Sequence, residues 1–181
     1  MRIIAGDWRG RPLTAPKGDT TRPTADRTRE ALFSMLASRV GSFEGLAVAD
    51  LFAGSGALGL EALSRGAAST LFVEQDGAAL DALRANIATL SAGTRATVRA
   101  GSVLALGPAP AALDVVMMDP PYASGAGMVA ADKLARLGWI GSATWVTIET
   151  SRTEAVALAG FVVDAERQYG RARLTILRRD A

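Results

Sequence analysis

From about position 46 onward, short apolar runs alternate with longer stretches that carry apolar residues at helical spacing. The apolar runs predict strands at about 47–52, 70–74, 96–100, 113–118, 144–149, 161–166 and 172–178. The helical spacing predicts helices at about 56–66, 77–90 and 126–137. Strands that alternate with helices form a mostly parallel sheet covered on both faces, so the predicted fold class is α/β.

The last two predicted strands are separated only by a few residues around Gln168, Tyr169 and Gly170. A connection of this length is too short for a helical crossover, so the two strands must pair antiparallel. We therefore expect a seven-stranded, mostly parallel sheet whose last strand is reversed, at the edge of the sheet.

The segment before this pattern is organised differently. Residues 2–5 and 11–15 are short, extended-looking segments, and the two glycines of the intervening segment 6–10 suit a hairpin-like turn. Helical spacing then begins at about 25 and ends at about 39, with Thr24 as the expected N-cap. A β-hairpin and a helix are therefore expected to form an N-terminal arm.

The length and composition favour a single domain. The chain has 181 residues, of which 49% are hydrophobic and 21% charged, close to the averages for globular domains. We expect a single domain over 1–181, with the basic arm and its helix at 1–45 and the α/β core at 46–181. A monomer is the expected state.

Two kinds of absence narrow the chemistry and the location. The chain has no cysteine and no histidine, which excludes disulfides, thiolate nucleophiles, Ser-His-Asp triads and nearly all zinc sites, so no metal is expected. It also has no run of eighteen apolar residues and no signal-peptide pattern at its start, so we expect a cytoplasmic protein without a membrane partner.

Basic residues concentrate in two parts of the chain although the formal net charge is only +2. The first cluster consists of Arg2, Arg9, Arg11, Lys17, Arg22, Arg27 and Arg29. The second consists of Arg167, Arg171, Arg173, Arg178 and Arg179. Such patches are the electrostatic footprint of a nucleic-acid partner, and the alternative is that they only solubilise the surface.

A glycine-rich motif follows the first strand of the core. Asp50 ends this strand, and Gly54, Gly56 and Gly59 open the following helix in the pattern G-x-G-x-x-G, with Ser55 between the first two glycines. Glycines at this place let the backbone approach a nucleotide-like cofactor at the carboxyl end of the strand. Glu74 ends the next strand, where a carboxylate can bind ribose hydroxyls.

Two cofactors fit this motif. The glycine pattern and Glu74 also occur in NAD-binding sites. Asp50 favours S-adenosylmethionine, because a carboxylate attracts a methionyl ammonium and repels a pyrophosphate. A tight structural turn without a ligand is the third interpretation.

The second motif is the segment Asp119-Pro120-Pro121-Tyr122, which ends a strand of purely apolar residues. The prolines hold the backbone rigid and donate no hydrogen bond there, so a carbonyl oxygen and the Asp119 carboxylate can both accept from one amino group. Acceptors on both protons favour the positive charge that develops when an exocyclic amine attacks a sulfonium methyl, and Asp119 can then take the departing proton. Tyr122 can stack on the base, which must be accessible or extruded.

These motifs, with the segments 2–11 and 22–33, resemble the family of 16S ribosomal RNA guanine-966 N2-methyltransferases over nearly the whole chain. The resemblance implies a Rossmann-like seven-stranded methyltransferase sheet, S-adenosylmethionine as donor and N2 of a guanine in 16S rRNA as acceptor, either as RNA or within an assembling or mature small subunit. The residues that it assigns to the donor are Asp50, Gly54, Ser55, Gly56, Glu74, Ser102 and Val103. Those assigned to the methyl-acceptor pocket are Asp119, Pro120 and Tyr122.

At the end of the third strand, Ser102 stands where related methyltransferases carry an acidic or amide residue that contacts adenine. The resemblance also places the segment 22–29 over the site, and the expected RNA contacts are Arg22, Thr24 and Arg29 of this segment together with Arg9 and Arg11 of the basic arm. The Asp/Asn-Pro-Pro-aromatic motif also marks adenine-N6 and protein glutamine-amide methyltransferases. These acceptors, a nicotinamide oxidoreductase and a non-enzymatic RNA-binding module remain the alternatives.

Overall fold

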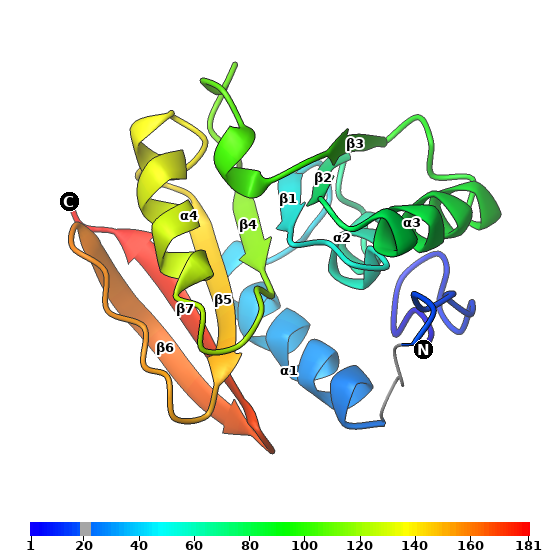
Figure 1. The fold of residues 1–181 in the computed structure, drawn as a ribbon, viewed down its shortest axis with the longest axis horizontal. Helices are drawn as coiled ribbons and strands as arrows, with labels where there is room; N and C mark the ends of the chain where they lie inside the picture. Colours follow the sequence, from blue (N-terminus) through cyan, green and yellow to red (C-terminus); the bar gives the residue numbers. More distant parts are fainter. Residues whose placement is uncertain (19–22) are drawn as a thin grey trace.

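The computed structural model describes residues 1–18 and 23–181, with the backbone alone at 23 and 24. Within these residues, seven strands form one sheet in the order β3-β2-β1-β4-β5-β7-β6 (Figure 1). The strands are β1 (Ala47–Leu51), β2 (Ser69–Glu74), β3 (Ala96–Ala100), β4 (Val115–Met118), β5 (Trp145–Ser151), β6 (Phe161–Tyr169) and β7 (Ala172–Arg179). The helices are α1 (Pro23–Val40), α2 (Ala57–Ser64), α3 (Gly77–Thr89), α4 (Ala126–Arg136) and the 3₁₀ turn η1 (Val103–Ala105).

The order of the strands reverses beside β1. This strand pairs in parallel with β2 on one side and with β4 on the other, so that Val48 lies opposite both Thr70 and Val115. The chain proceeds outward from β1 to β3 and then returns to place β4 on the opposite side of β1. In open α/β sheets, ligands bind at such a switch point, outside the carboxyl ends of the strands.

The α/β class and all seven predicted strands are confirmed, but the reversed strand is not at the edge of the sheet. β7 runs antiparallel to both of its neighbours and lies between β5 and β6, so β6 forms the edge. Burial explains the order, because Leu174, Ile176 and Leu177 of β7 are buried whereas Val162 and Val163 of β6 are exposed. The more apolar strand takes the inner position.

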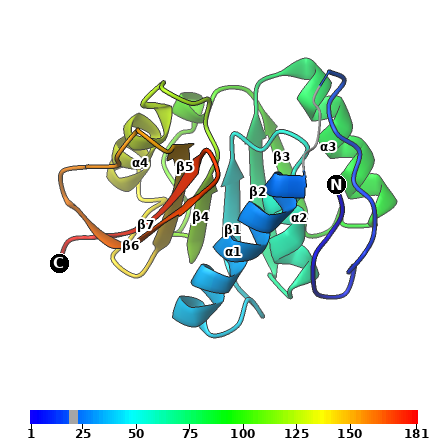
Figure 2. The same cartoon turned by 90° about the horizontal axis from the view of Figure 1, so that it is seen from below.

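Alternating side chains of the strands face two layers of helices. In β4, Val115 and Met117 pack in the core that contains residues of α1, α2 and α3, whereas Val116 and Met118 pack in the core that contains residues of α4. Figure 2 shows α4 and α1 on opposite sides of the sheet. The sheet is therefore covered on both faces, as a parallel sheet requires.

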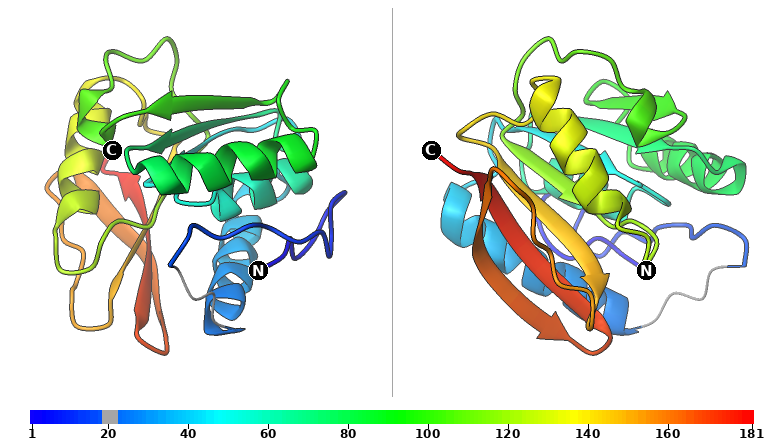
Figure 3. Two further views of the ribbon diagram at one scale, coloured as in Figure 1. Left: turned by 45° about the vertical axis from the view of Figure 1, so that its right-hand side comes forward. Right: turned by 60° about the vertical axis from the view of Figure 1, so that its left-hand side comes forward.

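The N-terminal arm is a hairpin held mainly by contacts with helices. Its two limbs form one antiparallel bridge, between Arg2 and Pro12, rather than paired strands, and Ile3 N–H donates to the Arg11 carbonyl at 2.9 Å. Several backbone groups instead bond to α2, where the Glu61 carboxylate accepts from Ile4 and Ala5. Figure 3 shows this segment running beside α2 and α3.

The predicted helix after the arm is confirmed, but it begins at Pro23, so Thr24 lies inside the helix and is not its N-cap. Proline suits the first helical position because its fixed φ matches the helix and its missing N–H would have no partner in the first turn. In the described part of the chain, no helix is both long and apolar enough to cross a membrane.

Candidate active site

Two cavities lie at the carboxyl ends of β1 and β4, where the strand order reverses. The larger, of about 730 Å³, is lined by the loop after β1, by α1 and by the turn between β6 and β7. The smaller, of about 560 Å³, is lined by the ends of β2 and β3 and by the loop after β4. Phe52, Asp119 and Tyr122 line both, so these three residues stand at the junction between the cavities.

The glycine motif forms the close turn from β1 into α2 that its spacing predicts. Gly56 has a φ of 82°, and a Cβ there would lie 2.3 Å from the Leu83 side chain. A Cβ on Gly59 would lie 2.3 Å from the Phe72 ring. Gly54 differs, since a Cβ there would meet nothing within 4 Å and the backbone is open on the side of the larger cavity. The last two glycines serve packing, and the first leaves room for a ligand.

Asp50 is the penultimate residue of β1 and lies beneath this turn. Its side chain is 1% exposed, and its Oδ2 accepts a hydrogen bond from the Gly59 N–H at 2.8 Å. Burial raises the pKa of this carboxyl well above its usual value, the nearby charges of Asp119 and Glu74 add to the rise, and the hydrogen bond from Gly59 opposes it. Asp50 therefore braces the glycine turn and also lines the larger cavity.

Glu74, at the end of β2, is held in place by backbone N–H groups. Its Oε2 accepts from Gly54 at 2.7 Å, and its Oε1 accepts from Gln75 and Asp76, each at 2.8 Å. The carboxylate lines the smaller cavity together with Ser102. It therefore connects the glycine turn to the smaller cavity with a fixed geometry.

The end of β3 completes the smaller cavity. Ser102 caps the turn η1, with its Oγ accepting from the Leu104 N–H at 3.2 Å, and Val103 is buried against the wall. Both residues line the smaller cavity, as does Asp76. The Ser102 hydroxyl is occupied as a local cap, which limits how it can contact a ligand.

The segment Asp119-Pro120-Pro121-Tyr122 leaves β4 at the junction of the cavities. Asp119 is exposed and Pro120 is buried, with α4 packed so closely on it that a Cβ on Gly127 would lie 3.2 Å from the Pro120 ring. The following residues are fixed from another loop, since Glu154 accepts from the Ala123 N–H at 2.9 Å. The loop is thus braced on both sides.

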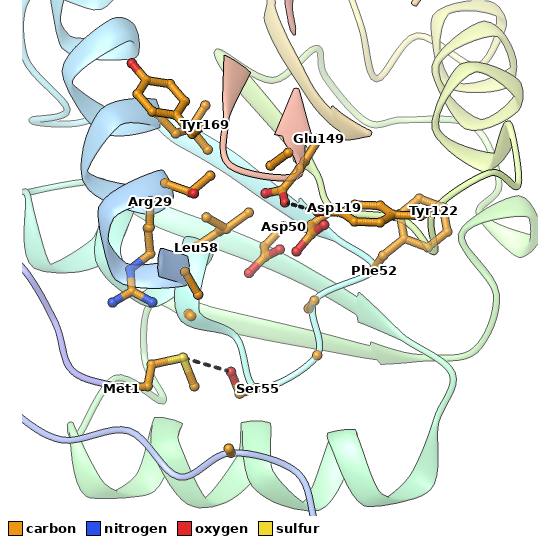
Figure 4. A pocket seen from close by; sticks show the side chains of 18 of the residues that line it. Met1, Arg29, Asp50, Phe52, Ser55, Leu58, Asp119, Tyr122, Glu149 and Tyr169 are labelled. Atoms are coloured by element: carbon orange, nitrogen blue, oxygen red, sulfur yellow. Dashed lines mark hydrogen bonds between the residues drawn. The ribbon is translucent and has the colours of Figure 1, made fainter. Parts of the chain in front are cut away.

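Tyr122 makes a hydrogen bond that the sequence did not suggest. Its hydroxyl donates to Oε1 of Glu149 in β5 at 2.8 Å, although the tyrosine is 47% exposed (Figure 4). Partial burial of this half-exposed side chain raises the pKa of the Tyr122 hydroxyl, and the hydrogen bond and charge of Glu149 add to the rise. Burial also raises the pKa of Glu149, which the hydrogen bond from Tyr122 lowers. The ring is therefore oriented across the junction.

The outer wall of the larger cavity comes from α1 and from the turn between β6 and β7. Gly170 and Arg171 form this turn, and Tyr169 is the last residue of β6. Because β6 runs parallel to β5, the turn reaches the same edge of the sheet as the glycine motif. The wall thus carries an exposed arginine that the sequence analysis placed in a basic cluster but not in the site.

Arg29 lines this cavity, but its guanidinium bonds to other protein groups. It is 5% exposed, and its Nη2 donates to the Arg2 carbonyl and to Asp26. Burial lowers the pKa of its guanidinium, against the opposing charges of Asp26 and Glu61. The geometry favours a role in fastening the arm to α1, not the RNA contact expected from the sequence.

The other expected RNA contacts are not brought to the cavities by the described structure. Arg9 and Arg11 are exposed on the arm and line neither cavity, and Arg11 donates to the Thr89 carbonyl at the end of α3 at 2.7 Å. Arg22 and the side chain of Thr24 lie outside the described residues. A role for Arg9 and Arg11 in RNA binding stays a prediction about the surface beyond the cavities.

Sequence reasoning missed Glu149, Phe52 and Arg171 as site residues. Phe52 has a positive φ of 61°, and the residue types of the glycine motif do not indicate that it lines the site. Glu149 could have been found by noting that it is a carboxylate in a predicted strand that pairs beside β4, one residue beyond the registered pair Met118 and Ile148. Arg171 could have been found from the short turn of the antiparallel pair.

Comparison with known proteins agrees with this geometry. The family model described as "Conserved hypothetical protein 95" matches residues 1–178. Ribosomal RNA small subunit methyltransferase D of Escherichia coli is 40% identical over 83% of this chain and 74% of its own length, and the Haemophilus influenzae protein of the same name is 37% identical over 84% and 79%.

Solved structures agree as well. The structure of the putative methyltransferase yhhF from E. coli superposes with a TM-score of 0.84 at 36% identity, covering 100% of this chain and 98% of the other. A magnesium protoporphyrin IX methyltransferase with bound SAM, 17% identical, shares the fold with a TM-score of 0.63. The chain therefore belongs to the ribosomal RNA small subunit methyltransferase D family of S-adenosylmethionine-dependent methyltransferases.

Proposed function

We propose that this protein transfers a methyl group from S-adenosylmethionine to the exocyclic N2 amino group of a guanine in 16S ribosomal RNA. The observation that carries the proposal is the position of Asp119 and Tyr122, which line both cavities and so can meet a donor from one side and an acceptor from the other. Family membership supports it, since curated relatives bear the name ribosomal RNA small subunit methyltransferase D.

The residues around the glycine turn suit this donor. The backbone at Gly54 is open, and the carboxylates of Glu74 and Asp50 lie on either side of the turn. Glu74 would accept from the ribose hydroxyls, Asp50 would attract the methionyl ammonium, and Gly54, Ser55 and Gly56 would form the adjoining backbone. Ser102 and Val103 would line the adenine side of the smaller cavity. When bound, S-adenosylmethionine supplies an electrophilic methyl group on a positively charged sulfur.

The loop after β4 supplies what the acceptor amine needs. The guanine N2 lone pair is delocalised into the ring, so the amine is a weak nucleophile until its protons are held by acceptors. A backbone carbonyl oxygen at Pro120 and the Asp119 carboxylate would accept these two protons, and they favour the positive charge that develops on nitrogen. The amine would attack the methyl group directly as the bond from that group to sulfur breaks, and Asp119 would receive the proton that leaves the nitrogen, so no covalent enzyme intermediate is needed.

The larger cavity can accept a base only if the RNA leaves that base unstacked. A base reaches such a cavity only when it is unstacked, and the half-exposed Tyr122 ring offers a face on which it can stack. Arg171 on the cavity wall would contact a neighbouring phosphate. We infer that the protein acts as a cytoplasmic monomer on an accessible or extruded guanine, in RNA or in a small-subunit particle.

The alternative functions are less well supported by the fold and by the relatives. NAD-binding Rossmann sheets commonly have the strand order 3-2-1-4-5-6, whereas here an antiparallel β7 is inserted before β6. A protein glutamine-amide methyltransferase and an adenine-N6 methyltransferase share the Asp-Pro-Pro-aromatic segment. The named relatives are ribosomal RNA enzymes, which favours RNA as the acceptor.

The acceptor class is tested by incubating the protein with methyl-labelled donor and ribosomes from cells that lack this enzyme, then separating RNA from protein. We expect label in 16S rRNA and none in ribosomal proteins or 23S rRNA. Asp119→Ala serves as the inactive control. Label in the protein fraction would contradict the proposal and favour glutamine methylation.

A further inference from the structure

We propose that Glu149 is a specificity-determining residue that recognises the N1–H group of the target guanine. The inference rests on the proposed function and deepens it, because it names the group that distinguishes guanine from other bases carrying an amino group. The inference comes from where the structure places the Glu149 carboxylate.

Glu149 belongs to the strand next to the Asp119 loop. β4 and β5 pair in parallel up to Met118 and Ile148, so Asp119 and Glu149 are the next residues along these neighbouring strands. Ile148 packs in the core on the α4 side, so Glu149 points to the opposite face, where it lines the larger cavity. Figure 4 shows the Asp119 and Glu149 carboxyl groups directed into the same space.

The Glu149 carboxylate is oriented but not fully used. Its Oε1 accepts the hydrogen bond from the Tyr122 hydroxyl at 2.8 Å, which fixes the side chain. Among the described residues, the structure shows no hydrogen bond to its Oε2. A carboxylate has about four acceptor positions on its two oxygens, so it can accept from a ligand while Tyr122 remains bound. Its intermediate exposure at a cavity wall leaves access for that ligand.

Guanine presents donors that match this arrangement. Its N1–H lies next to the N2 amino group, so a base whose amine is held by Asp119 directs its N1–H toward a neighbouring acceptor. Adenine and 2-aminopurine carry an unprotonated N1, whose lone pair would face the carboxylate. A site built to accept a hydrogen bond rejects an analogue that lacks the donor, because the acceptor is then left unpaired beneath the bound base.

A purely structural role for Glu149, as the group that orients Tyr122, makes a different prediction. Loss of that role would slow transfer to every substrate alike, because the ring would be misplaced for every base. Loss of N1–H recognition would instead change the preference between substrates that differ only at the N1 and C6 positions. The two roles are therefore separated by a ratio of rates and not by a single rate.

The experiment uses two RNA substrates that carry either guanine or 2-aminopurine at the methylated position; both have the N2 amine, and only guanine has N1–H. Competition between them gives the ratio of kcat/KM values. We expect the wild-type protein to prefer guanine by about 10- to 100-fold, the effect of one hydrogen bond to a charged group. Glu149→Gln should reduce this preference to about threefold or less, because its amide can donate to an unprotonated N1.

Two variants serve as controls. Tyr122→Phe keeps the carboxylate and the ring, so it should lower both rates and retain the guanine preference. Glu44→Gln removes an exposed carboxylate that lines neither cavity, so it should behave as wild type. Thermal melting of each variant shows whether it is folded. The ratio of kcat/KM values for guanine and 2-aminopurine in the wild-type protein tests the inference even if a variant fails to fold.

Equal wild-type rates on the two RNAs would overturn the inference while leaving the proposed function intact, since the guanine would still be methylated. An unchanged guanine preference in folded Glu149→Gln would also overturn it, leaving Glu149 as a support for Tyr122. Absence of transfer to either RNA, with donor binding intact, would overturn the proposed function itself.

Discussion

The Glu74 carboxylate accepts a hydrogen bond from the backbone N–H of Gly54 at 2.7 Å, although the two residues are twenty positions apart. The bond joins the end of β2 to the glycine turn after β1 and so fixes the wall of the donor site. We expect Glu74→Ala to weaken binding of S-adenosylmethionine and of its demethylated product by about 10- to 100-fold, as for loss of a hydrogen bond to a charged group. Calorimetry with both ligands measures this, with Glu44→Ala as the matched control. Unchanged affinities would remove Glu74 from the donor site.

Asp119 should affect turnover and donor binding unequally. Because its carboxylate acts on the acceptor amine and on the charge that develops there, Asp119→Ala should lower kcat by about 100-fold or more while changing donor affinity by less than about threefold. Single-turnover methyl transfer and donor titration measure the two quantities separately. Undiminished turnover would exclude Asp119 from the mechanism, and an equal loss in both quantities would make it a donor-binding residue.

The buried carboxyl group of Asp50 should lower the stability of the fold at neutral pH while it strengthens donor binding. Its pKa is raised in the folded state, so as pH rises above the pKa of the unfolded chain, the unfolded state releases this proton first and the folded state loses stability. The side-chain amide of the Asp50→Asn variant keeps an acceptor for the Gly59 N–H and has no proton to lose. We therefore expect the free energy of unfolding of the variant, relative to wild type, to increase as the pH rises above the usual pKa of an aspartate, about 4.

Donor affinity of Asp50→Asn should fall at the same time by about three- to tenfold, because a neutral amide attracts the methionyl ammonium less than a carboxylate does. Denaturant titrations at several pH values, together with calorimetry, test both parts. If the difference in unfolding free energy between Asp50→Asn and wild type does not depend on pH, the pKa of Asp50 is not raised in the folded state.

Glu61 should be the main stabilising link between the arm and the core. It is 0% exposed, accepts from Ile4 and Ala5 at 2.8 and 3.0 Å, and pairs with Arg65 at 2.9 Å. Glu61→Ala removes the acceptor for two backbone groups and a negative charge beside the buried Arg29, so the free energy of unfolding should fall by about 3–5 kcal/mol. Urea denaturation measures it, with Glu44→Ala as the control. A loss below about 1 kcal/mol would show that the other contacts of the arm hold it without the Glu61 carboxylate.

Arg171 should contribute to RNA affinity through a phosphate contact. Arg171→Ala should weaken RNA binding and reduce the log-log dependence of affinity on salt by about one unit or less, because fewer counterions are released. Donor affinity should not change. Arg99→Ala is the matched control, since Arg99 is exposed on β3 at the opposite side of the sheet. An identical salt dependence for both variants would leave Arg171 without a role in docking.

The features that the sequence predicted correctly are local ones. The glycine turn and the Asp119 loop are contiguous segments whose residue types carry their own conformational meaning, and the strands and helices follow from periodicity. Glu149 escaped notice because its relation to Tyr122 depends on which strands are neighbours. The sequence predicted an RNA contact for Arg29, and its burial could not be predicted because two of its partners, the Arg2 carbonyl and Glu61, come from distant segments. The position of β7 inside the sheet likewise depends on the relative burial of two strands.

The most direct test of the central claim is the identity of the methylated nucleoside. 16S rRNA labelled by the protein is digested to nucleosides, which are compared by chromatography and mass spectrometry with synthetic standards. The account predicts that the label elutes as N2-methylguanosine and is absent when Asp119→Ala replaces the wild-type protein. Label that elutes as N6-methyladenosine, or as any methylated nucleoside other than N2-methylguanosine, would contradict it.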